Sequence, residues 1–341
     1  FMRTGQLMME QSTSLNGAAA EPILVAEQLH KAYGPRAALR NLSFTLQPGH
    51  ILGFLGPNGA GKTTAIRILT TILEPTSGQF YVGGIRSDHP REIRRKIGVL
   101  PESLGFAKQM TGIECLTFFG QMYGRSKTDA KSYGMELLKA VGLEKRAKSL
   151  IGSYSRGMRQ RLGIARSLVN DPVVVFFDEP TLGLDPRGQQ ELLSLVNWVA
   201  RERNVGVVLC SHDLPEIEEV CDDVVILRSG RIIAQGTVGE VIERGQHNVV
   251  RVQVAEQSVA TARQVIQALP NVVKVTPITA TGDWLLIELA SSGEFTKNME
   301  KEIKAQILNT LVRADIAVLS FESEGGRLQD VFFQLTEEEA E

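Results

Sequence analysis

The stretch that decides the fold of this 341-residue chain reads Gly56-Pro57-Asn58-Gly59-Ala60-Gly61-Lys62-Thr63. It fits the spacing Gly-x-x-x-x-Gly-Lys-Ser/Thr at every specified position. The apolar run 51–55 comes directly before it, and residues 64–71 carry apolar side chains at helical spacing after it. A strand, a glycine-rich turn and a helix N-terminus in this order surround an anion with backbone N–H groups. The sequence therefore predicts a loop that binds nucleotide phosphates.

Three side chains of this loop have predicted contacts with a nucleotide. Lys62 is expected to reach the β- and γ-phosphates, and the hydroxyl of Thr63 is expected to bind Mg²⁺. Thr64, the next residue, is placed to hydrogen-bond the α-phosphate. The alternative is a glycine-rich turn with an unpaired surface lysine, which the flanking strand and helix make the weaker interpretation.

A second motif reads Val173-Val174-Val175-Phe176-Phe177-Asp178-Glu179. An apolar strand that delivers an acid at its carboxyl end is the Walker B arrangement, in which Asp178 holds Mg²⁺. Glu179 follows at the position where a general base activates water beside the γ-phosphate. Two acids can also simply make the exit of a strand soluble, but the upstream loop favours the catalytic interpretation.

The pattern of elements predicts an α/β fold. Strand signals return at 205–210 and 224–227 after helical segments, and this alternation predicts a mostly parallel sheet covered by helices. Residues 104–152 alternate apolar clusters with polar stretches at helical period, which predicts a mainly helical insertion.

The pattern changes after Gly236. Strands are predicted at 249–254, 272–275, 285–289 and 316–321, with helices at 259–269 and 295–311, a turn at Thr281-Gly282-Asp283 and a short helix from Leu328. The order β-α-β-β-α-β is the ferredoxin-like plan, an α+β fold. We therefore predict a flexible tail at 1–22, a nucleotide-binding domain at 23–242 and a ferredoxin-like accessory domain at 243–341, of which 337–341 is expected to fray.

The composition argues against several classes of function. Lys and Arg number 37 against 39 Asp and Glu, a net charge of −2, which argues against general electrostatic capture of nucleic acid. No apolar run approaches the ~18 residues that a membrane span requires. Cys115, Cys210 and Cys221 form no Cys-x-x-Cys pair, which is typical of reduced thiols in a cytoplasmic protein.

A third motif, Tyr154-Ser155-Arg156-Gly157-Met158-Arg159-Gln160, lies just ahead of the 173–177 strand. It resembles the signature of ATP-binding cassette (ABC) ATPases, usually Leu-Ser-Gly-Gly-Gln. Ser155 and Gly157 match that signature, while Tyr154, Arg156 and Met158 depart from it as they do in exporter-type members. Without the resemblance, Ser155 would be an ordinary helix N-cap.

Other landmarks follow in the family's order, and the resemblance covers about residues 23–242. Gly183-Leu184-Asp185 looks like the D-loop, and His212 looks like the switch histidine that contacts the γ-phosphate. Tyr33 resembles the aromatic residue that stacks on adenine. The resemblance implies a mostly parallel sheet, an antiparallel β subdomain and a helical subdomain at about 103–152.

Glu102 departs from the family pattern, which usually has Gln in this loop. A Gln carbonyl ligates Mg²⁺ without adding charge, whereas Glu102 brings a third negative charge close to Asp178 and Glu179. We therefore expect Glu102 to ligate the metal and the ordering of the site to depend more strongly on Mg²⁺.

The resemblance implies the Mg²⁺- and ATP-dependent energising subunit of an exporter, peripheral on the inner face of the cell membrane. Two such subunits, as a homodimer or with a second ATPase subunit, sandwich two ATP molecules head to tail and drive separate transmembrane permease subunits. The segment 326–335 is similar to the tail of exporter ATPases with a small C-terminal domain.

A soluble ABC ATPase acting in translation or DNA repair is the alternative. The chain has a single phosphate-binding loop and no sustained heptad run, whereas translation-type relatives usually carry two cassettes and repair-type relatives a long coiled coil. The basic cluster Arg91, Arg94, Arg95 and Lys96 is better explained as a solvated helix face than as a nucleic-acid contact. No nucleic-acid partner is expected.

Overall fold

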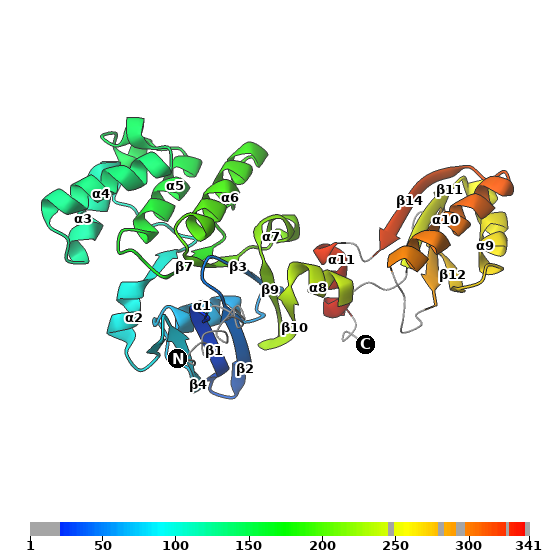
Figure 1. The fold of residues 1–341 in the computed structure, drawn as a ribbon, viewed down its shortest axis with the longest axis horizontal. Helices are drawn as coiled ribbons and strands as arrows, with labels where there is room; N and C mark the ends of the chain where they lie inside the picture. The colour runs from blue at the N-terminus through cyan, green and yellow to red at the C-terminus, as the bar shows by residue number, and fades with distance from the viewer. Residues whose placement is uncertain (1–20, 245–248, 279–282, 291–296, 325–326, 338–341) are drawn as a thin grey trace, which may run out of the picture.

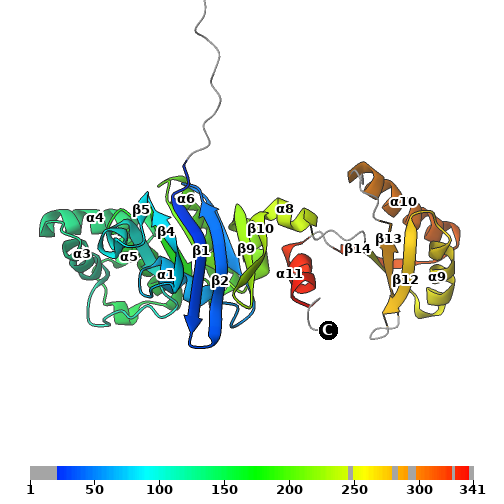
Figure 2. The same ribbon diagram turned by 90° about the horizontal axis from the view of Figure 1, so that it is seen from below.

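The computed structural model describes residues 21–244, 249–278, 283–290, 297–324 and 327–337 (Figures 1 and 2). Residues 1–20 of the predicted tail, Thr281 and Gly282 of the predicted turn, and residues 338–341 of the predicted fringe lie outside these ranges. None of the helices in the described ranges combines the length and the apolar composition needed to cross a bilayer.

The central sheet has six strands, and five of them are parallel. In spatial order they are β10 (Arg231–Thr237), β9 (Asp223–Arg228), β3 (Ile51–Leu55), β8 (Gly206–Cys210), β7 (Val174–Asp178) and β6 (Ile97–Leu100). Only β10 is antiparallel to its neighbour. Every residue of β3 and β8 is buried, as expected for central strands covered on both faces. The predicted mostly parallel sheet is confirmed.

Alternate residues of the central strands enter two different cores. Val175 and Phe177 of β7 belong to one cluster of buried side chains, while Val174 and Phe176 belong to the other. Successive strand residues point to opposite faces, so one short apolar run supplies both layers. The helices around this sheet are α1 (Lys62–Leu69), α2 (Pro90–Lys96), α5 (Arg156–Ser167), α6 (Pro186–Arg201), α7 (Leu214–Val220) and α8 (Val238–Arg244).

An antiparallel sheet and a helical insertion complete residues 21–244, which we call the N-terminal unit. The sheet contains β2 (Arg36–Leu46), β1 (Leu24–Tyr33), β4 (Ser77–Val82) and β5 (Ile85–Arg86), in that order. The insertion carries α3 (Gly112–Met122) and α4 (Lys127–Ala140), within the stretch predicted to be helical. Thr111 caps α3 with a reciprocal capping box to Glu114, which fixes where the insertion's first helix begins.

Residues 249–324, which we call the C-terminal unit, form a separate antiparallel sheet with its own buried cluster. Its elements are β11 (Val249–Val254), α9 (Val259–Gln267), β12 (Val272–Ile278), β13 (Trp284–Leu289), α10 (Lys297–Arg313) and β14 (Val318–Glu324), with the strands in the order β12-β13-β11-β14. The element order is the predicted β-α-β-β-α-β, and the ferredoxin-like assignment stays a prediction.

The last helix, α11 (Leu328–Glu337), packs against the N-terminal unit (Figure 1). Leu328 and Val331 are buried in the same cluster as residues of α7 and α8. The Leu328 N–H donates to Glu218 Oε2 at 2.9 Å, and Arg228 Nη1 donates to the Leu335 carbonyl at 3.1 Å. The sequence-based division placed this helix within 243–341, yet its buried side chains complete the core of the other unit.

Candidate nucleotide-binding site

The predicted phosphate loop, the three carboxylates and the histidine lie where four neighbouring parallel strands end. The phosphate loop follows β3, Glu102 follows β6, Asp178 and Glu179 end β7, and His212 follows β8. In α/β sheets, ligands bind at the carboxyl ends of the strands. The sequence thus brings together side chains that are far apart along the chain.

The phosphate loop depends on backbone conformations that favour glycine. Gly59 and Gly61 have φ values of +83° and +112°. A Cβ on Gly61 would lie 2.8 Å from the Ala38 carbonyl oxygen, which leaves no room for a side chain. Gly61 is also the N-cap of α1 and has no side chain to cap the helix's first N–H groups. These donors and the helix dipole favour an anion at this position.

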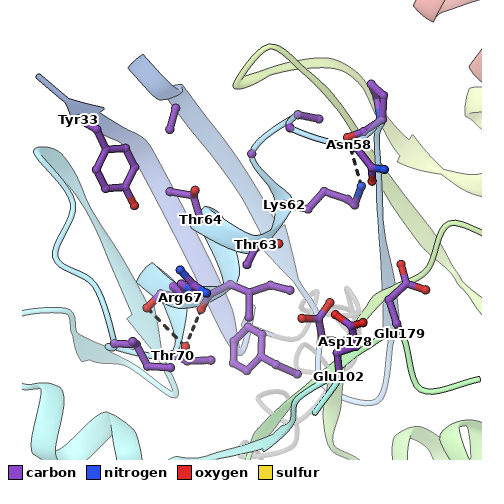
Figure 3. A pocket seen from close by; sticks show the side chains of 18 of the residues that line it. Tyr33, Asn58, Lys62, Thr63, Thr64, Arg67, Thr70, Glu102, Asp178 and Glu179 are labelled. Atoms are coloured by element: carbon purple, nitrogen blue, oxygen red, sulfur yellow. Dashed lines mark hydrogen bonds between the residues drawn. The ribbon is translucent and has the colours of Figure 1, made fainter. Parts of the chain in front are cut away.

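A cleft of about 1170 Å³ lies beside this loop (Figure 3). Its lining includes most of the predicted binding residues, namely Tyr33, Pro57, Asn58, Gly59, Ala60, Gly61, Lys62, Thr63, Thr64, Glu102, Asp178 and Glu179. Gly56 and His212 are outside the lining, but the Gly56 carbonyl accepts a hydrogen bond from Lys62 Nζ, and His212 contacts Glu179, which does line the cleft. Tyr33 lies at the cleft with half of its surface exposed, and Lys31 Nζ is 5.5 Å from its ring centroid.

Three carboxylates face the cleft from β6 and β7 (Figure 3). Burial, and then the charges of Glu179 and Glu102, raise the pKa of Asp178, while Lys62 and Arg67 oppose that rise. The predicted repulsion among the acids is therefore present at Asp178. Within the described ranges, no three His, Cys, Asp or Glu side chains are assembled as a metal cluster. The Thr63 hydroxyl and the carboxylates of Asp178 and Glu102 nevertheless supply the hard oxygen ligands that Mg²⁺ prefers.

Glu179 and His212 are in direct contact. His212 Nδ1 lies 2.7 Å from Glu179 Oε2, and the Glu179 side chain is 17% exposed against 66% for His212. Glu179 has a φ of +50°, an unusual conformation for a residue with a side chain, and its N–H donates to the Cys210 carbonyl at 2.9 Å. Such strained backbone is concentrated at functional sites. Glu179 can accept a proton from a water molecule, and its carboxylate orients the His212 ring through Nδ1.

The predicted signature and D-loop residues lie away from the cleft, since Ser155, Gly157 and Asp185 are not part of its lining. Ser155 is the N-cap of α5 and accepts from the Met158 N–H at 3.2 Å. The guanidinium of Arg156 lies against Gly183, so the two segments touch within this chain.

Besides the predicted Lys62, the cleft is lined by three basic side chains that were not predicted from the sequence, Arg36, Arg40 and Arg67. Arg67 had a signal, because it follows Thr63 and Thr64 by four and three residues on one helix and therefore shares their face. Arg36 and Arg40 lie on β2 and had no local signal. All three add positive charge beside a site for phosphates.

The fold and the site together define a nucleotide-binding protein of the P-loop class. The sequence profile described as ABC transporter matches residues 39–182. The linearmycin resistance ATP-binding protein LnrL of Bacillus subtilis (strain 168) is 31% identical over 92% of this chain and 98% of its own length. The bacitracin transport ATP-binding protein BcrA of Bacillus licheniformis is 41% identical over 62% of this chain and 69% of its own.

Solved structures agree with these relatives. The dimeric ATP-binding cassette MJ0796, in a post-hydrolysis state with ADP and Pi, matches with a TM-score of 0.57 and 25% identity, over 63% of this chain and 98% of that one. The chain belongs to the ABC transporter ATP-binding family, and it is an ATPase subunit. The resemblance inferred from the sequence is confirmed.

Proposed function

We propose that this chain is the energising subunit of an ABC exporter that works with separate transmembrane permease subunits. The observation that carries the proposal is the match to LnrL along 98% of that protein's length, which takes in the C-terminal unit as well as the cassette. The ATPase site itself is common to importers and exporters, so the exporter assignment depends on that full-length likeness.

In this proposal, different residues of the cleft bind different parts of the ATP molecule. The ring of Tyr33 stacks on adenine at the outer end of the cleft. Lys62 exchanges its loop carbonyl partners, Gly56 and Pro57, for the β- and γ-phosphates, and Thr64 contacts the α-phosphate. The glycine-rich backbone and the start of α1 provide the remaining donors.

Thr63, Asp178 and Glu102 are the proposed Mg²⁺ ligands. The ion would neutralise charge on the β- and γ-phosphate oxygens. Holding Asp178 and Glu102 ionised next to each other costs free energy, so these ligands favour a site that binds the cation together with the nucleotide.

Glu179 and His212 are the proposed catalytic pair. Glu179 accepts a proton from water as the water oxygen attacks the γ-phosphorus, and ADP leaves with the electrons of the broken P–O bond. His212 donates to Glu179 through Nδ1–H, and in its doubly protonated form it also donates to a γ-phosphate oxygen through Nε2–H. Hydrolysis removes the group that both side chains contact.

Two copies, or this chain and a second ATPase subunit, are proposed to close head to tail around two ATP molecules. Ser155, Gly157 and Asp185 lie away from the chain's own cleft, as residues that serve a partner's nucleotide must. Loss of the γ-phosphate removes the bridging contacts and opens the pair, a ligand-biased switch between two states. The subunit would be cytoplasmic and peripheral on the membrane's inner face, with the insertion at 103–152 in contact with the permease.

Purification of the intact complex from its native cells tests the proposal. Co-isolated membrane subunits that stimulate ATP hydrolysis support the exporter assignment. Bound RNA or DNA in place of membrane subunits would favour the soluble ATPase of translation or repair. The C-terminal unit is proposed to assist dimerisation, and the mass of the complex after removal of residues 249–324 tests that role separately.

A further inference from the structure

Three of the six buried polar side chains in the described part of the chain form one cluster. Thr181, Ser211 and Glu216 have exposed fractions of 2%, 1% and 6%. Glu216 Oε2 accepts a hydrogen bond from Thr181 Oγ1 at 2.8 Å and another from Ser211 Oγ at 2.9 Å. A single carboxylate oxygen thus joins two segments that are 30 residues apart in sequence.

Those two segments carry the proposed catalytic pair. Thr181 comes two residues after Glu179, and Ser211 comes directly before His212. Up to this point the backbone holds the segments in register, because β7 and β8 pair as far as Asp178 and Cys210. Beyond the strands, the Glu179 N–H still donates to the Cys210 carbonyl, and then the Glu216 carboxylate makes the next connection.

Burying the Glu216 carboxylate at this position costs free energy of folding. Its Oε1 atom is buried and has no hydrogen-bond partner in the described ranges. Burial raises the pKa of Glu216, the Thr181 and Ser211 hydroxyls counteract that rise, and the charges of Asp213 and Glu179 add to it. A buried polar group that is only partly satisfied destabilises a fold. An apolar side chain would avoid this cost only if the Thr181 and Ser211 hydroxyls were replaced as well, because both donate to the Glu216 carboxylate.

Helix capping does not explain Glu216. The N-cap of α7 is Asp213, whose side chain accepts from the Glu216 backbone N–H. The Glu216 side chain points to the two catalytic segments, while Glu218 on the same helix accepts from the Leu328 N–H of α11. Glu216 therefore adds no capping bond to its own helix.

We propose that Glu216 is a positioning residue that holds the Glu179 and His212 segments together through Thr181 and Ser211. The proposal depends on the proposed catalytic roles of Glu179 and His212. When ATP is bound, the carboxylate keeps the two loops from separating, so that Nδ1 of His212 stays in contact with Glu179. A loss of this alignment slows hydrolysis and leaves nucleotide binding intact, because Glu216 does not line the cleft.

The test measures single-turnover ATP hydrolysis and the ATP dissociation constant of the full-length chain. Glu216→Ala should lower the hydrolysis rate by about tenfold to a hundredfold, as expected for small misplacements of reacting groups. The dissociation constant for ATP should change by less than about threefold. Glu216→Gln keeps one acceptor oxygen of the same shape and should retain more of the rate. Glu219→Ala, at an exposed position on the same helix, is the matched control and should behave as wild type.

A double-mutant cycle with His212→Ala separates positioning from general stability. If Glu216 acts through His212, the double variant should hydrolyse ATP within about twofold of His212→Ala alone. Multiplicative effects, an unchanged rate in Glu216→Ala, or failure of both Glu216 variants to fold would overturn the proposal. Full activity of Glu179→Gln and His212→Ala would instead overturn the proposed catalytic roles, so the two failures are distinguishable.

Discussion

His212 Nδ1 lies 2.7 Å from Glu179 Oε2 at the ends of two adjacent parallel strands, β8 and β7. This contact orients the imidazole ring of an otherwise exposed side chain. It also leaves the second ring nitrogen free to face a phosphate. The carboxylate is the less exposed partner, which suits a base that must exclude bulk water while it binds one water molecule.

Replacing Glu179 by Gln removes the proton acceptor and keeps the size of the side chain. We expect hydrolysis to fall by about 10²- to 10⁴-fold, the usual contribution of a general base. ATP should then persist at the interface and hold the subunits together. Phosphate release and molecular mass in the presence of Mg-ATP are the measurements, with Glu219→Gln as the control. Turnover at the wild-type rate would contradict the role of Glu179.

The strand, loop and helix around the phosphate loop were predictable because their pattern is encoded locally. The order of Ile51–Leu55, the glycines and Lys62 specifies strand, loop and helix with no help from distant residues. The same holds for Asp178 and Glu179 at the end of an apolar run. Their convergence followed from the rule that parallel strands end at one edge of a sheet.

Features that depend on contacts across the fold were not predictable in this way. The pattern of 328–337 indicates a helix, but not that Leu328 is buried against the N-terminal unit instead of the neighbouring sheet. Nothing near Glu216 reveals that its carboxylate meets Thr181, 35 residues earlier. Such contacts depend on how separate elements pack, and periodicity within one element holds no information about that packing.

Glu102 is predicted to make the site more dependent on Mg²⁺. In Glu102→Gln one of the charges that raise the pKa of Asp178 and attract the cation is gone, so the site should bind Mg²⁺ more weakly. ATP hydrolysis as a function of Mg²⁺ should reach half its maximum at a higher concentration than in wild type. Superimposable Mg²⁺ curves for the two proteins would show that Glu102 has no such effect.

Glu102→Gln should also change how the stability of the metal-free protein depends on pH. A carboxyl whose pKa is raised by folding contributes stability that is present at low pH and lost as pH rises through the raised value. In Glu102→Gln the pKa of Asp178 is raised less, so folding loses less stability when Asp178 ionises. The Tm of the variant at pH 7 should therefore exceed that of wild type by about 2 °C. The difference should shrink as the pH falls and Asp178 becomes protonated, and also in saturating Mg-ATP.

Helix α11 is predicted to stabilise the N-terminal unit. Leu328 is fully buried in that unit's core, so Leu328→Ala should lower the free energy of unfolding by about 2–5 kcal/mol. The chain has two tryptophans, and Trp284→Phe leaves Trp198 of α6 as the reporter for this unit. Denaturant unfolding in that background is the measurement. Gln329→Ala, at an exposed neighbouring position, should change stability by less than about 0.5 kcal/mol.

An unchanged Trp198 transition in Leu328→Ala would mean that α11 contributes nothing to the core it contacts. The result also affects how the C-terminal unit is removed. A deletion of 243–341 takes away Leu328 and Val331 and opens the core, whereas a deletion of 249–324 retains them. Only the second deletion separates dimerisation from the stability of the ATPase.

Tyr33 is predicted to contact the adenine base of the nucleotide and to make no contact with the phosphates. Tyr33→Ala should raise the dissociation constants for ATP and ADP by about tenfold each, since stacking on an aromatic ring contributes about 1–3 kcal/mol per base. Tyr33→Phe keeps the ring and should match wild type, because the described contact of this side chain involves its face and the Lys31 ammonium. Equilibrium titration with each nucleotide is the measurement. Equal losses for ATP and ADP identify a contact to the base, since a group that touches the γ-phosphate, as proposed for His212, must discriminate between them. A loss confined to ATP would place Tyr33 with the catalytic residues and leave adenine without its stacking partner.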